Sequence, residues 1–469
     1  MKNIFGFKLN AIALAIMLSS TSVYAANTII VSKNGSVLSN KPSNSPALNI
    51  DGTKIAFVSH SGNLVGDTKL QSNIYLKDTT SNTIVRVSVD NSGIAGERAS
   101  YGPTINGDGN KVVFYSSSEN LVSSDGNGKP DVFLRDLKNN STQLISVTKS
   151  GVQGDAGSIE GVISADGNVV AFSSRATTLT GLSTNAKSQV YVKDLFTGDL
   201  EVVSINNSGD AGDQDSFSPS ISRDGRYISF ASFANNLSSI FNFNQFDIYV
   251  YDRQTKKTEL ITASANLHSG TPSISGDGRY VAFMTLADNL VSGDTVNTID
   301  IVVYDRVTKI FKRVQAPGEA PKGHSFSPKI SSDGRFVAFY SSATNLVSGD
   351  TNDRDDMFVF DLALNRVERV SVSATGAQST NNVDQFIALS GNGQAAAFGS
   401  PDGIFVSGDT NGVADIFVRQ RDPAQSVTPV AKIAVIPTQE CTNGSAYIKL
   451  DGSISTDITN KATYTWTGP

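Results

Sequence analysis

Short apolar stretches, each bounded by turn-forming residues, follow one another along almost the whole chain. Two clear examples are Tyr280–Met284 and Phe336–Tyr340, which are rich in β-branched and aromatic residues and are strand-like in length. Stretches that alternate apolar and polar residues, such as Thr83–Val89, lie between apolar stretches of this kind. Gly, Asn, Asp and Ser fill the intervals, and these residues favour turns. The pattern predicts an all-β protein built from many short strands.

The strongest internal signal is an Asp-Gly or Asn-Gly turn with a short strand before it and an apolar strand after it. Intervals of 53 to 59 residues separate its seven copies, which are anchored at Asp51, Asp108, Asp166, Asp224, Asp277, Asp333 and Asn392. Each repeat also holds a third strand like Asp356–Asp361 and a fourth, alternating strand like Arg366–Val372. Four strands per repeat of this length predict a seven-bladed β-propeller.

The two ends of the repeat array complement each other. The seventh repeat stops after its third strand, Asp415–Arg419, while Thr28–Ser32 is a surplus strand before the first repeat. We therefore expect the N-terminal strand to complete the last blade and close the ring, which removes unpaired sheet edges. The alternative is an open solenoid with a spare N-terminal strand.

The N-terminus has the composition of a secretory signal peptide. Lys2 and Lys8 precede the apolar run Leu9–Leu18, and small residues precede a cleavage position after Ala25. The alternative, an uncleaved anchor, would need about 20 apolar residues. We expect export to the periplasm or the cell surface, and no membrane-spanning segment after cleavage.

Charge and cysteine content narrow the partners and the source of stability. The net charge is −6, and it becomes −8 when the two lysines of residues 1–25 are removed. A mildly acidic chain gives no electrostatic reason to bind nucleic acid. The single cysteine, Cys441, lies after the repeats, so the repeats must be stabilised by a packed core.

The sequence motif of the repeats resembles that of a known family. Pro272–Gly278 and the following strand read Pro-x-Ile-Ser-x-Asp-Gly-Arg-x-Val-Ala-Phe, and the other repeats vary this theme. This wording resembles the WD40-like PD40 repeat of the TolB family of propellers, over residues 28 to about 421. The resemblance implies the propeller fold. It also implies one possible role, as a TolB-like partner of a peptidoglycan-associated lipoprotein, although the α/β domain that precedes the TolB propeller has no counterpart here.

The C-terminal segment differs from the repeats. Residues 422–430 form a polar, Pro-containing linker. In residues 431–469, the turn Leu450–Ser455 and the strand ending at Trp466 resemble the first half of a PKD domain, an immunoglobulin-like sandwich. Such a sandwich needs about 100 residues, so we expect an incomplete one; the alternative is an unrelated β-tail. The predicted organisation is a signal peptide at 1–25, a propeller at 26–421, the linker at 422–430 and the partial sandwich at 431–469.

Three loops between the second and third strands share the spacing Asp-x-Asn-x-x-x-Asp. Their residues are Asp125, Asn127 and Asp131; Asp350, Asn352 and Asp356; and Asp409, Asn411 and Asp415. Oxygen ligands at alternating positions suit Ca²⁺, which takes 6–8 hard donors. The alternative is turn chemistry, because Asp and Asn stabilise tight turns without any metal. Both interpretations stay open at this point.

Other candidate residues are few. The three histidines, His60, His268 and His324, come without an evident third ligand for zinc. An aromatic cluster in the fourth repeat either packs internally or forms an exposed binding patch; it contains Phe217, Phe233, Phe241, Phe243 and Phe246.

The sequence contains no nucleophile elbow and no phosphate-binding glycine loop. We therefore expect no catalytic residues and no cofactor beyond the predicted calcium. The expected function is that of an exported, monomeric, non-catalytic binding or scaffold protein that contacts protein or glycan through one rim of the ring. The alternative is a propeller-based polysaccharide lyase or glycosidase, which requires carboxylates, a base or a metal to converge at one mouth of the ring.

Overall fold

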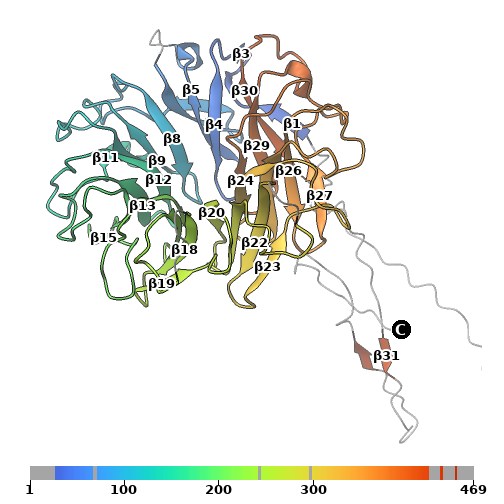
Figure 1. Ribbon diagram of the computed structural model, residues 1–469. Coiled ribbons are helices and arrows are strands. Elements are labelled where there is room, and N and C mark those ends of the chain that lie inside the picture. The colour runs from blue at the N-terminus through green and yellow to red at the C-terminus, as the bar shows by residue number, and fades with distance from the viewer. Residues whose placement is uncertain are drawn as a thin grey trace, which may run out of the picture.

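The computed structural model describes residues 27–66, 71–240, 245–294 and 298–421, and the backbone of two further short strands, β31 (Ala434–Ile436) and β32 (Lys449–Asp451). Within these residues the chain forms seven four-stranded antiparallel sheets arranged in a ring (Figure 1). The predicted seven-bladed β-propeller is confirmed. The predicted signal peptide, Cys441 and Trp466 lie outside the described residues, as does most of the predicted sandwich.

Each blade uses consecutive strands from the innermost to the outermost. The first blade contains β4 (Ser43–Leu48), β5 (Lys54–Ser59), β6 (Asn73–Asp78) and β7 (Thr83–Arg86). The second contains β8 (Ser100–Ile105), β9 (Lys111–Ser116), β10 (Asp131–Asp136) and β11 (Ser141–Leu144). The third contains β12 (Ser158–Ile163), β13 (Val169–Ser174), β14 (Gln189–Asp194) and β15 (Leu200–Val202). The fourth contains β16 (Ser216–Ile221), β17 (Tyr227–Ser232), β18 (Asp247–Asp252) and β19 (Lys257–Leu260).

The remaining blades follow the same order until the last. The fifth contains β20 (Ser269–Ile274), β21 (Tyr280–Thr285), β22 (Asp300–Asp305) and β23 (Ile310–Arg313). The sixth contains β24 (Ser325–Ile330), β25 (Phe336–Ser341), β26 (Asp356–Asp361) and β27 (Arg366–Arg369). The seventh contains β28 (Ala388–Leu389), β29 (Ala395–Ser400), β30 (Asp415–Gln420) and β1 (Asn27–Ile30). A small hairpin, β2 (Lys33–Asn34) with β3 (Val37–Leu38), and two 3₁₀ turns, η1 (Gly62–Leu64) and η2 (Gly403–Phe405), lie in the loops.

The N-terminal strand closes the ring as predicted. Strand β1 pairs antiparallel with β30, so that Ile29 lies opposite Val418. Beyond the strand, the hydroxyls of Ser32 and Ser39 both donate to Oδ1 of the buried Asp415, the latter at 2.8 Å. Residues nearly 400 positions apart in sequence are therefore joined by backbone and side-chain hydrogen bonds, and β1 pairs the edge of β30 that would otherwise be open.

The hydrophobic core lies between the blades. Ala56 and Val58 of the first blade pack with Val112 and Phe114 of the second, and equivalent clusters follow around the ring. The second and third strands of each blade are almost wholly buried, as the burial of Phe114 shows. Burying one such side chain stabilises the fold by about 1.5–3 kcal/mol. Each blade therefore depends on its neighbours, as the repeat pattern implied.

The end of the ring that carries the seven Asp-Gly and Asn-Gly turns, which we call the turn end, is held by a circle of backbone hydrogen bonds. Ile50 donates to Gly107 at 3.2 Å, Gly276 donates to Ser332 at 2.9 Å, and Asn392 donates back to Ile50 at 2.9 Å. Four further bonds complete the circle through the other turns. A β-carbon added at Gly276 would lie 2.7 Å from the Ser332 carbonyl oxygen, so glycine permits this close approach.

The opposite end, which we call the loop end, carries the loops that join the second and third strands of each blade and the loops that lead into the innermost strands. Six innermost strands have a register shift there, for example between Phe326 and Lys329 of β24. The shift places Phe326 opposite Tyr340 and Lys329 opposite Ala338, which are two residues apart on β25. Phe326 and Lys329 therefore lie on the same face of the sheet, in one row.

Candidate functional site

The three predicted calcium loops lie at the loop end, on the second, sixth and seventh blades. In each of them the Asn side-chain nitrogen donates to the last Asp, at 2.8 Å for Asn127 and Asp131. The distances are 2.9 Å for Asn352 and Asp356 and 2.6 Å for Asn411 and Asp415. The amide nitrogen thus faces the last carboxylate in all three loops, a contact that stabilises a tight turn.

On the sixth blade an arginine side chain lies where a bound cation would be needed. Arg369 Nη1 is 3.0 Å from Asp350 Oδ1 and 3.5 Å from Asp356 Oδ2. The fifth blade repeats the arrangement, with Arg313 Nη1 2.7 Å from Asp294 Oδ1 and 3.8 Å from the second carboxylate. These two loops already contain a positive charge between their carboxylates.

The second and seventh blades lack this arginine. Leu144 and Ile30 occupy the register position of Arg369, opposite the third residue of the neighbouring strand. Desolvation raises the pKa of Asp131 to about 6. Desolvation, and then the nearby charge of Asp415, raise the pKa of Asp409 to about 6. No three His, Cys, Asp or Glu side chains gather as a metal-binding group within the described residues. Calcium at these loops stays a prediction.

The histidines of the fourth-to-sixth blades are used in loop packing. The His268 ring stacks on Phe246 at a centroid distance of 4.5 Å, and its Nδ1 accepts the Phe246 backbone N–H. His324 Nδ1 accepts the backbone N–H of Ile299 at 3.1 Å. Each imidazole therefore ties a loop that enters an innermost strand to the loop beside it.

Part of the predicted aromatic cluster reaches solvent. Phe217 and Phe233 lie 5.9 Å apart, and Phe246 packs against both. The Phe233 side chain is 37% exposed, so the cluster is partly packing and partly surface. Phe241 and Phe243 lie outside the described residues.

Aromatic pairs recur on alternate blades around the ring axis at the loop end. Because each innermost strand contacts the next around the ring, the second residues of these strands encircle the axis at one level. We call the three pairs found there the aromatic collar: Tyr101 with Tyr115 (5.8 Å), Phe217 with Phe233 (5.9 Å) and Phe326 with Tyr340 (5.1 Å). Tyr101 and Phe233 are exposed and the other four rings are partly buried. Solvent-reached aromatic rings around a common axis are typical of a ligand-binding surface.

A lysine continues the row of one collar pair. Lys329 lies on the same sheet face as Phe326 and Tyr340, one register step deeper along β24. Its side chain is exposed, yet desolvation by the surrounding protein lowers its pKa. Lys329 belongs to β24, the innermost strand of its blade, so it lies near the ring axis with protein around it and with solvent access. No acceptor in the described part of the chain pairs with its ammonium group.

Carboxylates surround the same part of the collar. Burial, and then the charges of Asp355 and Asp384, raise the pKa of Tyr340. Desolvation also raises the pKa of Asp355 and of Asp384. Across the ring, Glu160 Oε2 accepts the Ser218 backbone N–H at 2.7 Å. Burial of Tyr115, and then the nearby charge of Glu160, raise the pKa of Tyr115. Titratable groups with shifted pKa values beside exposed aromatic rings are candidates for general acid–base chemistry.

Sequence reasoning identified Phe217 and Phe233 but missed the other four collar residues and Lys329. A signal was present in the repeat wording, because an aromatic residue stands two positions before the proline in three repeats, at Tyr101, Phe217 and Phe326. Lys329 stands alone at its repeat position, where the other repeats have small or apolar residues. Periodicity alone did not predict which of these residues face the axis, because the register shift in the innermost strand decides that.

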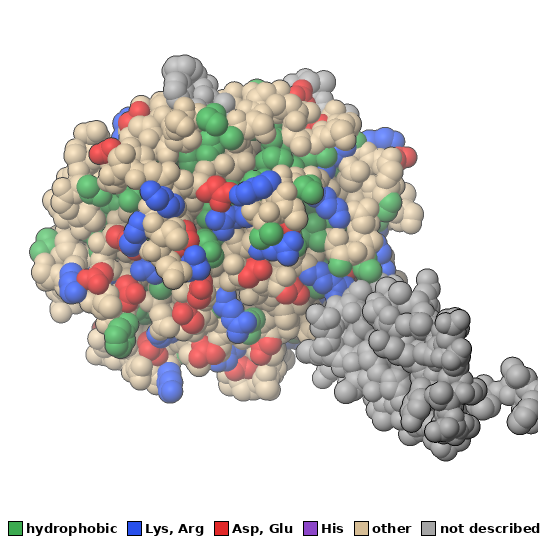
Figure 2. Space-filling model, turned by 90° about the horizontal axis from the view of Figure 1, so that it is seen from below, with side chains coloured by type: hydrophobic (Ala, Val, Ile, Leu, Met, Phe, Trp, Pro, Cys, Tyr) green, Lys and Arg blue, Asp and Glu red, His purple; other side chains and the backbone are tan. Residues whose placement is uncertain are grey.

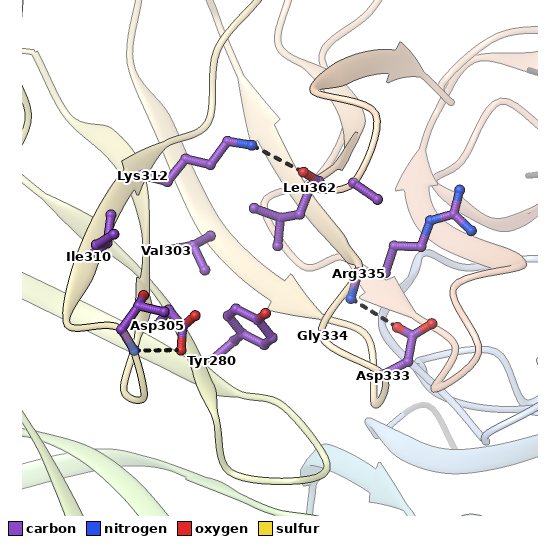
Figure 3. Close-up of a pocket in the computed structure, with 11 residues that line it drawn as sticks. Tyr280, Val303, Asp305, Ile310, Lys312, Asp333, Gly334, Arg335 and Leu362 are labelled. Carbon is purple, nitrogen blue, oxygen red and sulfur yellow. Dashed lines mark hydrogen bonds between the residues drawn. The ribbon is translucent and has the colours of Figure 1, made fainter. Parts of the chain in front are cut away.

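The turn end holds a cleft of about 490 Å³ between the fifth and sixth blades. Lys312 Nζ reaches across it to the Leu362 carbonyl oxygen at 3.1 Å, beside Tyr280 and Val303 (Figure 3). Of its lining residues, Arg335 pairs with Asp361 and Asp305 with Arg279, both at 2.7 Å, and Asp333 accepts the backbone N–H of Arg335 at 3.0 Å. On the face drawn in Figure 2, acidic and basic side chains are likewise interspersed. The cleft therefore offers less chemistry than the loop end.

The comparisons with known proteins support the fold and change the functional expectation. No family model and no curated protein sequence matches the chain. Among solved structures, the oligogalacturonate lyase of Vibrio parahaemolyticus is 14% identical, with a TM-score of 0.50 over 85% of this chain and 98% of that one. An oligogalacturonate lyase in complex with manganese is 12% identical, with a TM-score of 0.51 over 85% and 96%.

The TolB structure from Acinetobacter baumannii also matches, at 15% identity over 75% of this chain and 76% of that chain. Its TM-score of 0.38 is too low to carry an argument. The two lyase structures are therefore similar to this chain in fold, which agrees with the seven-bladed β-propeller described above.

The expectation of a non-catalytic binding or scaffold protein is wrong. It rested on the absence of a recognisable catalytic cluster in the sequence, but two of the solved structures that share the ring over most of their length are lyases. The alternative that we gave, an enzyme built on the propeller, is better supported. The residues that could serve it belong mostly to the sixth repeat, and Asp384 of the seventh repeat lies beside them.

Proposed function

We propose that the protein is a propeller-based polysaccharide lyase that cleaves an acidic glycan at the aromatic collar. The observation that carries the proposal is Lys329, a solvent-reached ammonium group with a lowered pKa and no partner among the described residues, in one row with Phe326 and Tyr340. The solved lyases that share the fold, one of them in complex with manganese, support the same choice.

The reaction requires a base and an apolar surface for the sugar ring, and the collar with its neighbouring lysine has both. A lyase removes the proton on the carbon next to the sugar carboxylate, and the electron pair forms a carbon–carbon double bond as the glycosidic oxygen leaves. A lysine whose pKa is lowered by desolvation is neutral at a lower pH than an ordinary lysine, so Lys329 suits the role of base. The aromatic faces of Phe326 and Tyr340 offer apolar area on which a sugar ring can lie.

Tyr340 suits the second proton transfer. Burial and the nearby carboxylates raise its pKa, so the phenol keeps its proton and remains a donor at neutral pH. In the proposed reaction that proton goes to the departing glycosidic oxygen, and Lys329 carries the proton taken from the sugar carbon. The two transfers balance, and both groups return to their starting state by exchange with solvent.

Asp355 and Asp384 favour a second candidate, a glycosidase. Two carboxylates with raised pKa values beside Tyr340 are the groups that general-acid hydrolysis of a glycosidic bond requires. They would also repel an acidic sugar. The product distinguishes the two reactions, because elimination leaves a double bond that absorbs ultraviolet light and hydrolysis leaves only saturated reducing ends.

The test is to incubate the purified protein with a panel of polyuronates and neutral polysaccharides, with and without added Mn²⁺. We expect an increase in ultraviolet absorbance with at least one polyuronate. The Lys329→Met variant should lower the initial rate at least about 10²-fold, the usual contribution of a general base.

The matched control is Lys322→Met, which removes an exposed lysine from the loop end of the same blade. Its rate should stay within about twofold of the wild-type rate, because surface substitutions away from the site are nearly neutral. Reducing ends without ultraviolet absorbance would replace the lyase by the glycosidase. Equal rates for wild-type protein and Lys329→Met would remove Lys329 from the mechanism.

We further propose that the protein acts as a monomer after export, either in the periplasm or at the cell surface. The signal-peptide pattern of residues 1–25 supports this location. No helix in the described part of the chain has the length and apolar character that a membrane crossing needs. Sequencing the N-terminus of the protein from culture medium and from periplasmic extract tests the cleavage after Ala25 directly.

A further inference from the structure

We propose that the loop between β9 and β10 of the second blade binds a calcium ion through Asp125 and Asp131. The proposal rests on a carboxylate oxygen of Asp125 that is buried and without a hydrogen-bond partner. It is independent of the lyase reaction, because the loop belongs to the outer part of its blade and Lys329 belongs to another.

The unsatisfied oxygen is Asp125 Oδ2. The residue is 9% exposed, and its other oxygen, Oδ1, accepts from Gln153 Nε2 at 2.9 Å. The same Gln153 nitrogen lies 3.3 Å from Asp131 Oδ2, so both carboxylates face one point. An ionised oxygen without a partner in such a place costs free energy unless a cation or water is bound there.

The corresponding loops of the fifth and sixth blades show which group can lie between the two aspartates. On the fifth and sixth blades, where the same two aspartates occur, Arg313 and Arg369 place a guanidinium between them. The second blade has the two aspartates but carries Leu144 at the register position of Arg369. The fold therefore keeps a positive charge between two such carboxylates on two blades, and on the second blade an ion can supply it.

The donor set indicates which ion. Asp125 and Asp131 offer only carboxylate oxygens, and the adjacent Gln153 amide presents an oxygen in place of its nitrogen when it rotates by half a turn. Hard oxygen ligands with room for water suit Ca²⁺, whereas zinc prefers Cys and His. A site with two carboxylates corresponds to the weak calcium sites of extracellular modules, with dissociation constants of about 10⁻⁴–10⁻³ M.

We do not extend the calcium proposal to the corresponding loop of the seventh blade. Asp409 and Asp415 also lack an arginine, and both oxygens of Asp415 accept hydrogen bonds, as both oxygens of Asp131 do. The difference between the two loops therefore lies in the first aspartate. Asp409 is not fully buried and carries no unsatisfied buried oxygen within the described residues.

The first test measures thermal unfolding and equilibrium dialysis with ⁴⁵Ca²⁺ on the full chain, in EDTA and in Ca²⁺ up to about 10 mM, roughly ten times the expected dissociation constant. We expect calcium to raise the melting temperature by at least about 2 °C. Asp125→Asn keeps the shape of the side chain and removes one charge, and it should weaken binding at least about tenfold.

Two exchanges between sister blades sharpen the test. Leu144→Arg copies Arg369 into the second blade, and it should abolish calcium binding while raising the melting temperature in EDTA. Arg369→Leu copies Leu144 into the sixth blade, and it should add one bound calcium per chain. Both variants keep arrangements that the fold already contains elsewhere, so we expect them to fold.

The proposal is overturned if wild-type protein shows the same melting temperature in EDTA and in calcium, or if Asp125→Asn binds calcium as tightly as the wild type. Calcium binding that survives Leu144→Arg would place the ion at another site and would equally overturn it. Rates on polyuronates play no part in these readouts, so a failed lyase proposal would leave this result unaffected.

Discussion

The two ends of the ring use their carboxylates in opposite ways. At the turn end, Arg226 holds Asp252 through two hydrogen bonds of 2.9 and 2.8 Å, and Arg279 holds Asp305 in the same way. The arginine lowers the pKa of Asp252 to about 2, and that of Asp305 even further. These carboxylates are ionised and paired at any physiological pH, as structural ion pairs should be.

At the loop end several carboxylates have a pKa shift of the opposite sign, although hydrogen bonds with Thr177 lower the pKa of Asp155 there. Desolvation raises the pKa of Asp131, Asp300 and Asp384, and none of them has a bidentate arginine partner among the described residues. Charges that the fold tolerates at a cost are typical of functional sites, whereas paired charges are typical of structural ones. The contrast supports locating both proposals at the loop end.

The backbone follows the same division. At the turn end, neighbouring turns are joined by the circle of backbone hydrogen bonds, which repeats from blade to blade. At the loop end, the loops differ in sequence between blades, and the register shift of the innermost strand orients side chains such as Tyr101 and Phe326 around the axis. The ring is therefore constant at one end and varied at the other, so equal substitutions should have unequal effects.

The largest effect on stability should come from adding one methyl group at the turn end. In Gly276→Ala the new β-carbon would lie 2.7 Å from the carbonyl oxygen of Ser332, on a neighbouring turn. Separating the turns breaks one bond of the backbone circle, and we expect a loss of about 2–4 kcal/mol in the free energy of unfolding. Urea unfolding measures it.

The control is Gly181→Ala at the loop end, where an added β-carbon meets nothing within 4 Å. We expect it to change stability by less than about 0.5 kcal/mol, or to raise it slightly, because alanine reduces the freedom of the unfolded chain. If both variants lose the same free energy, the turn end is no more constrained than the loop end and the comparison fails.

The same division explains what could be predicted from the sequence. The blade count, the four strands per blade and the closing strand all follow from repeated local patterns, such as the Asp-Gly turns and the surplus strand Thr28–Ser32. These patterns describe the constant part of the ring. Each copy confirmed the others, so a single chain contained seven independent observations of one fold.

The candidate site could not be predicted in the same way. Lys329 and Tyr340 lie on paired strands of one blade, but the register shift that places them on one face is not visible in the sequence, and Asp384 comes from the next repeat. The calcium prediction treated three loops as equivalent because their spacing is equal. Arg369, which distinguishes them, lies on another strand, 13 residues after Asp356 in sequence and 3.5 Å from it in space.

The next effect concerns acid stability at the turn end. Because the folded pKa of Asp252 lies below its unfolded value, its pairing stabilises the protein above about pH 4 and is lost as the pH falls toward 2. In Asp252→Asn we expect stability at pH 7 to fall by about 1–2 kcal/mol, less than the full shift because Arg226 is 36% exposed.

The difference between the variant and the wild type should shrink as the pH falls toward 2, where Asp252 is protonated in the unfolded chain and about half protonated in the folded protein. Urea unfolding across pH 2–7 gives the measurement. A constant difference between the two proteins over this range would mean that the Arg226 ion pair does not contribute, and that the substitution acts only through packing.

A smaller effect of opposite sign should appear at the loop end. Desolvation, and then the shared hydrogen bond with Asp294, raise the pKa of Asp300 above its ordinary value. The folded protein therefore binds a proton that the unfolded chain releases, and stability falls as the pH rises from about 4 toward neutrality. Asp300→Asn should flatten this decline, with the ion pair of Arg313 and Asp294 kept. Stability curves that stay parallel in wild type and variant would contradict the assignment.

The smallest effect on stability should accompany a loss of binding. Tyr101 is 41% exposed and touches Tyr115 in the aromatic collar, so Tyr101→Ala should change the free energy of unfolding by less than about 1 kcal/mol. The collar proposal nevertheless requires weaker retention of the glycan, because one stacking face is removed.

Phe196→Ala is the matched control, since Phe196 is an aromatic side chain of the turn end that is 94% exposed. Affinity for the cleaved oligosaccharide, measured by calorimetry, should fall severalfold in the first variant and stay unchanged in the second. Equal affinities would move the glycan away from the collar, while a large loss of stability in Tyr101→Ala would make the loop end as structural as the turn end.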